Sequence, residues 1–360
     1  MPVSEEHEEK PVDEILSHTE DEEEEEEGEE DEYENQPMGN PPTMLYPGNV
    51  IPDTRIEEID ADQDLTADIE PDTDYIDLVH LKISSLEDLH LDRFPNLESL
   101  CLRQNLITSI VALREISDKL EELDLYDNRI NHILSSIAHL VNLKTLDLSF
   151  NRIKNIKNID TLVNVEQLFF VQNKIKEIKN IENLTKLRML ELGANRIERI
   201  ENLEPFVNLQ SLFLGSNRIL KLEGLDTLVN LRVLSIQSNG ISKIENLEKL
   251  TQLEELYLTS NRLTEIEGLE TLENLQILDL SHNRISKLDN LGHLQKLEDL
   301  WISSNMIASF AEVDKLAKLE SLETVYLEHN PIQLQNATSY RRKVKLALPN
   351  LKKLDATYFS

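Results

Sequence analysis

The sequence predicts a solenoid of the α/β class, in which short strands stack into one concave parallel β-sheet. Three observations lead to this fold. The motif LxxLxLxxN recurs through most of the 360 residues, and its asparagine returns about every 22 residues. Its x-L-x-L-x centre alternates with period two, as in a strand that has one buried face. A fixed period of this size is typical of leucine-rich repeats, which bury their leucines only against neighbouring repeats.

Asparagine holds the same place in eleven motifs, at intervals of 23, 23, seven times 22 and finally 25 residues. The chain turns inward after each strand, which leaves buried backbone groups without partners in the sheet. An asparagine side chain offers two donors and an acceptor, so it can satisfy those groups. We therefore expect a buried amide ladder at Asn105, Asn128, Asn151, Asn173, Asn195, Asn217, Asn239, Asn261, Asn283, Asn305 and Asn330.

The back of each repeat is short. After the strand and the turn, about half of the 22 residues must cross the coil again, as in segments 153–156 and 175–178. A full α-helix barely fits, so we expect short 3-10 turns on the convex side. A thin convex side and a strand-lined inner side bend the coil into an arc. Such proteins bind partners on the concave sheet.

Three regions follow one another along the chain. Residues 1–74 hold 29 acidic and two basic residues, a formal charge of −27, and are predicted to be a disordered acidic tail, either solubilising or an interaction arm. Residues 75–330 are predicted to form a solenoid of about 11–12 repeats, the first of which has Leu81 in place of asparagine. Residues 331–360 are predicted to be a C-terminal cap.

The cap is expected to contain a helix. Tyr340, Val344 and Leu348 share one helical face, and Pro349 ends the helix. Leu351 and Leu354 then supply a last strand fragment. The cations Arg341, Arg342, Lys343 and Lys345 are either a binding patch or, as we favour, the solvated side of this helix near its C-terminal end.

Composition narrows the classes of function. The single cysteine, Cys101, excludes an intramolecular disulfide and fits a reducing compartment. No N-terminal signal pattern and no apolar run of about 18 residues is present, so we expect a cytosolic or nuclear protein that does not bind membranes. Outside the tail, 40 acids nearly balance 34 bases, which argues against a nucleic-acid partner.

The sequence carries no catalytic motif: P-loop, GxGxxG, HExxH and CxxC patterns are missing, and no cofactor or metal is expected. Asp124 and Asp147 take equivalent places on adjacent repeats and could form an acid/base pair or hold a cation. We favour an exposed acidic docking strip, because neighbouring repeats build no pocket around them. The chain is therefore predicted not to be an enzyme.

The outward position between the paired leucines carries the information for binding. Five of its eleven residues are aromatic and four are acidic: Cys101, Asp124, Asp147, Phe169, Glu191, Phe213, Ser235, Tyr257, Asp279, Trp301 and Tyr326. Aromatic side chains are enriched in interface hot spots, and acids between them select a basic partner. Packing between strands also favours aromatics, but it does not account for their mixture with acids. We predict a protein-binding face.

These repeats resemble the leucine-rich-repeat regulatory subunit of protein phosphatase 1 (the regulatory subunit 7 family). The resemblance covers about 75–360 and is carried by LCLRQNLI at 100–107, LDLYDN at 123–128, LETVYLEHNP at 322–331 and YRRKVKLALP at 340–349. It implies that the phosphatase catalytic subunit binds the concave face. The residues that match the family's contact positions are Asp147, Phe169, Glu191, Phe213, Asp279, Asp299, Trp301 and Tyr326, with Asp299 a shorter stand-in for glutamate.

The prediction is thus a non-catalytic regulatory subunit that controls the activity, maturation or localisation of the phosphatase. The resemblance further implies a nuclear and cytoplasmic protein, a role in mitosis, and an additional inhibitor protein in the complex. We expect a monomer apart from its partner. Two alternatives stay open: a leucine-rich-repeat scaffold of the splicing or tubulin-folding type, and an enzyme built on Asp124 and Asp147.

Overall fold

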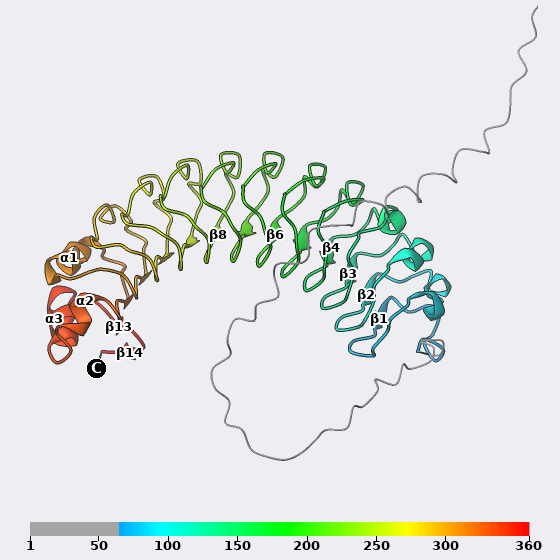
Figure 1. The fold of residues 1–360 in the computed structure, drawn as a ribbon, viewed down its shortest axis with the longest axis horizontal. Helices are drawn as coiled ribbons and strands as arrows, with labels where there is room; N and C mark the ends of the chain where they lie inside the picture. The colour runs from blue at the N-terminus through cyan, green and yellow to red at the C-terminus, as the bar shows by residue number, and fades with distance from the viewer. Residues whose placement is uncertain (1–64, 360) are drawn as a thin grey trace, which may run out of the picture. The chain divides into compact units, whose positions relative to one another are not determined.

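The computed structural model describes residues 65–359, which form a curved coil with the strands along its inner side (Figure 1). The first 64 residues of the predicted acidic tail lie outside the described residues. The coil is built on three-residue strands: β1 (Tyr75–Asp77), β2 (Ser99–Cys101), β3 (Glu122–Asp124), β4 (Thr145–Asp147), β5 (Gln167–Phe169), β6 (Met189–Glu191), β7 (Ser211–Phe213), β8 (Val233–Ser235), β9 (Glu255–Tyr257), β10 (Ile277–Asp279), β11 (Asp299–Trp301) and β12 (Thr324–Tyr326).

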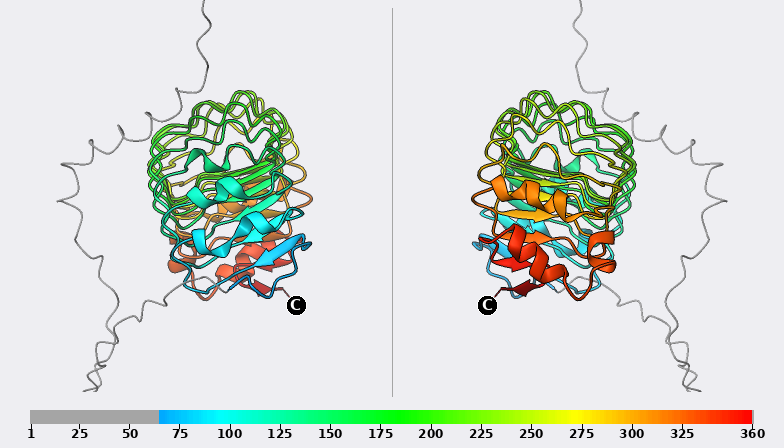
Figure 2. Two further views of the ribbon diagram at one scale, coloured as in Figure 1. Left: turned by 90° about the vertical axis from the view of Figure 1, so that its right-hand side faces the viewer. Right: turned by 90° about the vertical axis from the view of Figure 1, so that its left-hand side faces the viewer.

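All strands of the described chain belong to one sheet of 14, arranged in sequence order. β1 to β12 are parallel and in register, so that equivalent residues of successive repeats lie opposite one another. β13 (Lys353–Leu354) continues the parallel order, and β14 (Thr357–Tyr358) returns antiparallel to it. The end-on views of Figure 2 show the repeats superposed along the axis of the coil. The predicted parallel-sheet solenoid of leucine-rich repeats is confirmed.

The core is one continuous hydrophobic cluster that runs from Ile76 to Leu354. In each strand the middle residue points into it, as Leu278 does, and so does the apolar residue that follows the strand, as Leu280 does; both are fully buried. The residues on either side face away from the core, as the period-two pattern predicts. Since each repeat covers the leucines of its neighbours, stability is shared between repeats.

The asparagine ladder is also confirmed. Asn195 is typical: its Nδ2 donates to the carbonyls of Phe170, Leu192 and Gly193 at 2.8, 3.1 and 3.2 Å, and its Oδ1 accepts from the Ile175 amide at 3.0 Å. Each amide therefore links its own turn to the preceding repeat. The ladder reaches the first repeat, where Asn105 Oδ1 accepts from the amide of Leu81 at 3.1 Å.

The expected 3-10 turns occur only in part. Helical segments lie in the first repeat and in repeats longer than 22 residues: η2 (Glu87–Leu89), η3 (Leu91–Arg93), η4 (Val111–Glu115), η5 (Ser135–Ile137), α1 (Phe310–Asp314) and η6 (Lys315–Lys318). The 22-residue repeats return through consecutive tight turns instead, as where Leu162 N donates to Ile159 O and Val165 N to Leu162 O, both at 3.0 Å. One to three extra residues decide whether a helical turn fits.

A second asparagine row, absent from the expectations, stabilises the back of the coil. Asn158, Asn180, Asn202, Asn246 and Asn290 have φ near +60°. Each side chain donates to a carbonyl of the preceding repeat at 2.7 or 2.8 Å. Gly224 and Gly268 take the equivalent place in two repeats, also with positive φ. Asparagine and glycine are the residues that tolerate this left-handed backbone best.

The solenoid begins earlier than predicted. The Thr66 side chain is buried and its hydroxyl donates to Leu89 O at 2.7 Å, while Arg93 donates to the Thr66 hydroxyl at 2.8 Å. Ile69 packs against the core. Residues 65–74, assigned from their charge to the acidic tail, therefore cover the first repeat. A few apolar and hydroxyl side chains suffice to anchor a segment that is acidic on average.

The C-terminal cap consists of α2 (Pro331–Leu334), α3 (Tyr340–Ala347), β13 and β14. Tyr340, Val344 and Leu348 are buried against the last repeat, as predicted. Arg341 is not simply a solvated cation: it donates to the carbonyls of Leu354, Thr357 and Tyr358 and lies over the Phe359 ring. The basic face of α3 thus holds residues 354–359 in place. None of the helices in the described residues combines the length and apolarity that a membrane span requires.

Candidate partner-binding face

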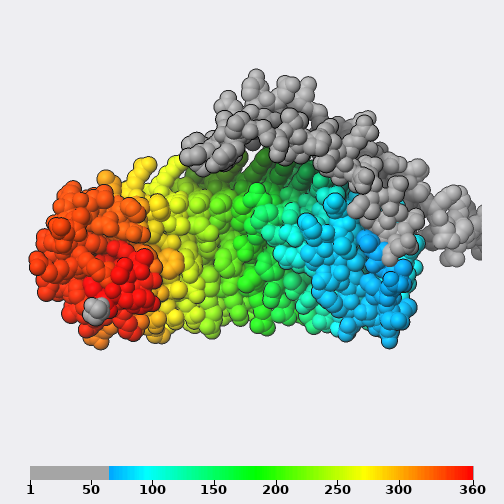
Figure 3. All heavy atoms as spheres, turned by 90° about the horizontal axis from the view of Figure 1, so that it is seen from below, coloured from blue at the N-terminus to red at the C-terminus, as the bar shows by residue number. Residues whose placement is uncertain are grey.

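The file of outward residues predicted from the repeat lies on the inner side of the arc. Each member is the third residue of its strand. All but Tyr326, in the last repeat, pair with their equivalents on both sides, as Asp279 does with Tyr257 and Trp301. Figure 3 views the coil from the open side of the arc. Most members are half-buried, while Ser235 and Asp279 are buried by their neighbours. Since the adjacent strand residue is in the core, these side chains point into the concavity.

The predicted contact residues fall into two groups on this face. Asp147, Phe169, Glu191 and Phe213 follow one another on β4 to β7. Asp279, Trp301 and Tyr326 follow one another on β10 to β12, and Asp299 lies two residues before Trp301 on the same face of β11. Ser235 and Tyr257 separate the groups. The structure therefore places all eight residues on the concave face.

The second group is an aromatic cluster built around a carboxylate. The Trp301 ring meets the Tyr326 ring at a centroid distance of 5.9 Å and the Tyr257 ring at 6.2 Å. Tyr257 and Trp301 come from strands on either side of Asp279, so their contact passes across that residue. The indole Nε1 of Trp301 is buried and has no hydrogen-bond partner among residues 65–359. An unpaired donor of this kind is costly unless a partner's acceptor reaches it.

Asp279 is 7% exposed, which is unusual for a carboxylate on an open sheet. Its Oδ1 accepts from the Ser281 amide at 2.9 Å. Burial raises the pKa of Asp279, and the hydrogen bonds from Ser281 and the charge of His282 oppose that rise. The charged form is therefore incompletely compensated in the free chain, and a cation supplied by a partner would be favourable.

The charges of the carboxylates in the first group, Asp147 and Glu191, are also incompletely compensated. Burial raises the pKa of Glu191, and the neighbouring Asp147 adds to the rise. Burial is also the largest cause of the raised pKa of Asp147, which the hydrogen bonds from Ser149 partly offset. The Arg103 guanidinium is 3.9 Å from Asp147, at the far edge of an ion pair. This half of the face also lacks full compensation of its negative charge.

Asp124 and Asp147, considered above as a catalytic pair, lie opposite each other on β3 and β4. Arg103 binds Asp124 at 2.8 Å and stacks over the Tyr126 ring, 4.1 Å from its centroid. A protein cation thus occupies the place that a substrate or metal would need. Among the described residues, no three His, Cys, Asp or Glu side chains are grouped so that they could hold a metal ion.

Tyr257 is the residue that the resemblance did not assign to the site. It contacts Trp301, and its hydroxyl donates to Glu255 at 2.7 Å. Burial and this hydrogen bond raise its pKa well above the ordinary value. The signal was present in the sequence, because Tyr257 occupies the same repeat position as Trp301. Ring contact across an intervening strand, however, requires the side-chain conformations.

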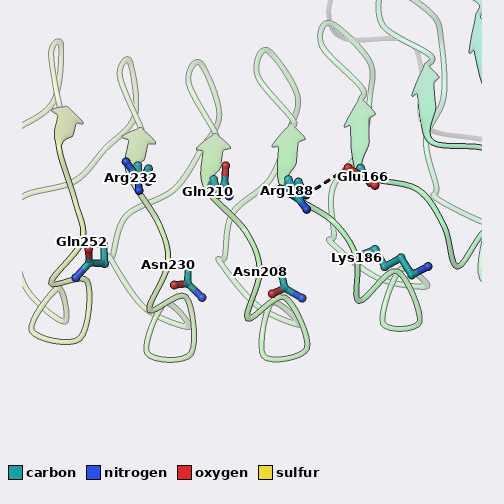
Figure 4. A pocket seen from close by; sticks show the side chains of 8 residues that line it. All are labelled: Glu166, Lys186, Arg188, Asn208, Gln210, Asn230, Arg232 and Gln252. Atoms are coloured by element: carbon teal, nitrogen blue, oxygen red, sulfur yellow. Dashed lines mark ion pairs between the residues drawn. The ribbon is translucent and has the colours of Figure 1, made fainter.

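An open groove lies on the flank where the chain enters the strands, with a volume of about 410 Å³ (Figure 4). It is lined by Glu166, Lys186, Arg188, Asn208, Gln210, Asn230, Arg232 and Gln252. Its arginines are paired within the chain, Arg188 with Glu166 at 3.3 Å and Arg232 with Glu254 at 2.7 Å. Lys186, which also lines the groove, donates to Asn164 Oδ1 at 2.6 Å. The lining is mostly polar and its cations are engaged within the chain, so we do not assign the binding site to it.

Comparisons with known proteins identify the same repeat. A model described as "Leucine-rich repeat" matches residues 232–358, and one described as "Leucine Rich repeats (2 copies)" matches residues 118–161. Among solved structures, an internalin (inlF) from Listeria monocytogenes superposes with a TM-score of 0.69 at 25% identity, over 80% of this chain and 82% of that one. A leucine-rich-repeat protein from Leptospira interrogans gives a TM-score of 0.61 at 24% identity, over 76% and 81% of the two chains.

Curated relatives agree with the resemblance stated above, which is confirmed. The Saccharomyces cerevisiae "Protein phosphatase 1 regulatory subunit SDS22" is 55% identical over 114 residues, 31% of this chain and 34% of that protein. The Schizosaccharomyces pombe protein of the same name is 49% identical over 97 residues, 27% of each chain. The human "Protein phosphatase 1 regulatory subunit 7" is 63% identical over 38 residues, 11% of this chain and 10% of that protein. The matches thus span about a third or less of these relatives.

Proposed function

We propose that this leucine-rich-repeat solenoid, whose curated relatives are named regulatory subunits of protein phosphatase 1, is itself a non-catalytic regulatory subunit of that phosphatase. Its relatives are named as regulators and not as enzymes, in agreement with the prediction that the chain has no catalytic role. The catalytic subunit binds in the concavity. Regulation follows from mass action, since the chain favours whichever conformation of the catalytic subunit fits the arc.

The proposal rests on polar groups of the concave face that lack full partners within the chain. Asp147, Glu191 and Asp279 are carboxylates whose pKa values are raised mainly by burial, and Trp301 holds an unpaired indole donor. A basic surface with hydrogen-bond acceptors would supply both missing partners. The aromatic side chains between the carboxylates give such a complex its apolar anchors.

The proposal extends to cell biology on the same family resemblance. We place the protein in the nucleus and cytoplasm, with a role in mitotic control of the phosphatase, in maturation of newly made catalytic subunit, and in a complex that includes a second inhibitor protein. The protein is otherwise monomeric. Localisation of the tagged full chain through the cell cycle tests the first two points, and the mass of the purified chain in solution tests the last.

A binding experiment tests the central claim. Purified catalytic subunit of protein phosphatase 1 is titrated into the full chain and into Trp301→Ala and Phe213→Ala, one variant from each group of contact residues. We expect each substitution to weaken binding by about 2 kcal/mol or more, as for a buried aromatic hot spot. Leu220→Ala, which removes a 60% exposed side chain outside the strands, is the control and should bind normally.

Two outcomes would overturn the proposal. Wild-type chain that binds no catalytic subunit would remove the phosphatase as partner. Variants Trp301→Ala and Phe213→Ala that bind like wild type, with unchanged thermal unfolding, would remove the concave face. Mass spectrometry of proteins captured by wild type and by the double variant would then distinguish a scaffold of another complex.

A further inference from the structure

A phenylalanine on the rim of the concave face has a backbone conformation that bulky residues rarely adopt. Phe150 precedes the ladder residue Asn151 and has φ +56°. Its equivalents in the other repeats of the ladder also have positive φ, but they are alanine or polar: Gln104, Asp127, Gln172, Ala194, Ser216, Ser238, Ser260, His282, Ser304 and His329. Left-handed backbone of this kind is strained for a large side chain. The repeat itself does not require a phenyl ring there, so Phe150 is a candidate for a role in binding.

The Phe150 ring belongs to a stack of three side chains from successive repeats. The Arg103 guanidinium lies 4.1 Å from the centroid of the Tyr126 ring, and the centroids of the Tyr126 and Phe150 rings are 4.8 Å apart. Ser149 takes the place of Tyr126 in the next repeat and is buried. Its small side chain leaves room for the Phe150 ring to reach Tyr126. Contacts within the chain therefore set the position of both rings. We call Tyr126 and Phe150 the rim patch.

The Phe150 ring is open to the outside of the stack. Its side chain is 39% exposed. No lysine or arginine of residues 65–359 lies over this ring, in contrast to Arg103 over Tyr126. A large apolar side chain in water is unfavourable in proportion to its exposed area. Contact with a partner would remove that cost, and aromatic side chains are frequent anchors of protein interfaces.

The charges next to the rim patch balance, and this selects the chemistry of its partner group. Within three positions of either ring, and including the Arg103 side chain over Tyr126, three carboxylates face three cations: Asp124, Asp127, Asp147, Arg103, Arg129 and Arg152. One of these pairs is in contact, Arg103 with Asp124 at 2.8 Å. A surface without net charge attracts neither a basic nor an acidic side chain. An apolar centre with a charged border is the usual composition of an interface hot spot.

We propose that the rim patch receives an apolar side chain of the protein that binds in the concavity. The assignment rests on the proposed function, in which that protein is the phosphatase catalytic subunit. Phe150 follows Asp147 by three residues, and Asp147 pairs with Phe169 on the next strand. The patch is therefore continuous with the first group of contact residues and extends it to the rim. The strained backbone of Phe150 is retained because binding, and not the repeat, requires its ring.

Calorimetric titration of the purified catalytic subunit into the full chain tests this assignment. Phe150→Asn introduces a residue that tolerates positive φ, and we expect it to weaken binding by about tenfold or more. Its melting temperature should equal that of wild type or exceed it by up to about 2 °C, because relief of backbone strain offsets the lost ring contact. Phe150→Leu keeps an apolar side chain and should bind within about threefold of wild type. His80→Asn, at the equivalent exposed position three repeats earlier, is the control and should bind normally.

The possible failures are distinguishable. Wild-type chain that binds no catalytic subunit overturns the proposed function and this assignment with it. Normal binding by wild type and by Phe150→Asn overturns the assignment alone. Equal losses in Phe150→Leu and Phe150→Asn would mean that the partner group needs a ring face, as a cation does, and would overturn an apolar occupant. A melting temperature of Phe150→Asn more than about 4 °C below that of wild type, measured by circular dichroism, would show that the ring serves the fold.

Discussion

The Trp301 ring meets the Tyr326 ring edge to face, with centroids 5.9 Å apart and planes at 73°. The two side chains come from adjacent strands, β11 and β12, and Tyr257 contacts the other side of the indole from two strands away. Edge-to-face contacts of this kind fix ring orientation. The orientation of the indole is therefore set by contacts within the chain, and Asp279 lies on the strand between Tyr257 and Trp301.

Tyr257 should act through Trp301. Tyr257→Ala removes one of the two rings that orient the indole, so we expect binding of the phosphatase catalytic subunit to weaken by about 1 kcal/mol. Tyr257→Phe keeps the ring and loses only the hydroxyl bond to Glu255, and it should bind nearly normally. Isothermal titration calorimetry measures both. Equal affinity of the alanine variant and wild type would show that the indole needs no such support.

We expect the Asp279 carboxylate to lower the stability of the free chain and to strengthen binding of a basic partner. Its folded-state pKa is raised mainly by burial, so the folded chain holds this proton more tightly than the unfolded chain does. The charged carboxylate therefore costs stability near neutral pH, and the cost disappears as pH falls through the raised pKa toward the unfolded value near 4. We expect Asp279→Asn to raise the unfolding free energy by about 0.5 kcal/mol at pH 7 and to weaken binding of a basic partner.

Thermal melts of wild type and Asp279→Asn between pH 3.5 and 7.5 measure this effect. The difference between their melting temperatures should be largest at neutral pH and vanish at the acid end. Asp299→Asn is a suitable control, because Asp299 is only half-buried beside Trp301 on the same strand. A lower melting temperature for Asp279→Asn at pH 7 would mean that the carboxylate stabilises the free sheet.

The asparagine ladder should be the most sensitive part of the core. Asn195→Ala leaves three carbonyls and one amide without their side-chain partner, and we expect it to lower the unfolding free energy by about 3 kcal/mol. Asn208→Ala is the matched control: it removes one exposed bond to Thr185 O at 3.1 Å and should cost less than about 1 kcal/mol. Urea unfolding curves compare the two, and similar midpoints would contradict the prediction.

In the second asparagine row, we expect a glycine-to-alanine substitution to cost more stability than an asparagine-to-glycine substitution. Gly268 has φ +68°, and a Cβ there would lie 2.4 Å from Ile244 O, so Gly268→Ala should lower the unfolding free energy by about 2 kcal/mol or more. Asn246 has φ +60° and bonds Leu222 O. Asn246→Gly loses that bond but keeps the favoured backbone, and should cost about 1 kcal/mol. Differential scanning calorimetry ranks them, and the reverse order would disprove this explanation of the row.

Much of the fold could be predicted because it follows from local periodicity. A residue such as Leu278 faces the core in every repeat for the same reason, so one pattern sets eleven strands and the orientation of Phe213 and Trp301. The convex side was predicted less well. Whether a helical turn forms there depends on one to three residues of repeat length, as between the η5 repeat and the 22-residue repeats, and on backbone conformations such as that of Asn246.

The ends of the solenoid were also less predictable, because they depend on contacts distant in sequence. Thr66 forms hydrogen bonds with Leu89 O and with Arg93, and Arg341 donates hydrogen bonds to the carbonyls of residues 354, 357 and 358. Average charge assigned the first to a tail, and helical spacing assigned the second to the solvated side of a helix. Neither composition nor helical spacing reports a hydrogen bond between segments that meet only after folding.

The sequence alone determined the repeat, the buried asparagine ladder and the identity of the residues in the concave file, because each is a matter of spacing along the chain. Tertiary structure decided how those residues interact. Only the packed side chains bring Tyr257 to Trp301 across Asp279, bury that carboxylate and leave the indole donor unpaired. The physical reason is that periodicity fixes the side of the sheet to which each side chain points. Burial and ring contact depend instead on side-chain conformations and on neighbours from three strands at once.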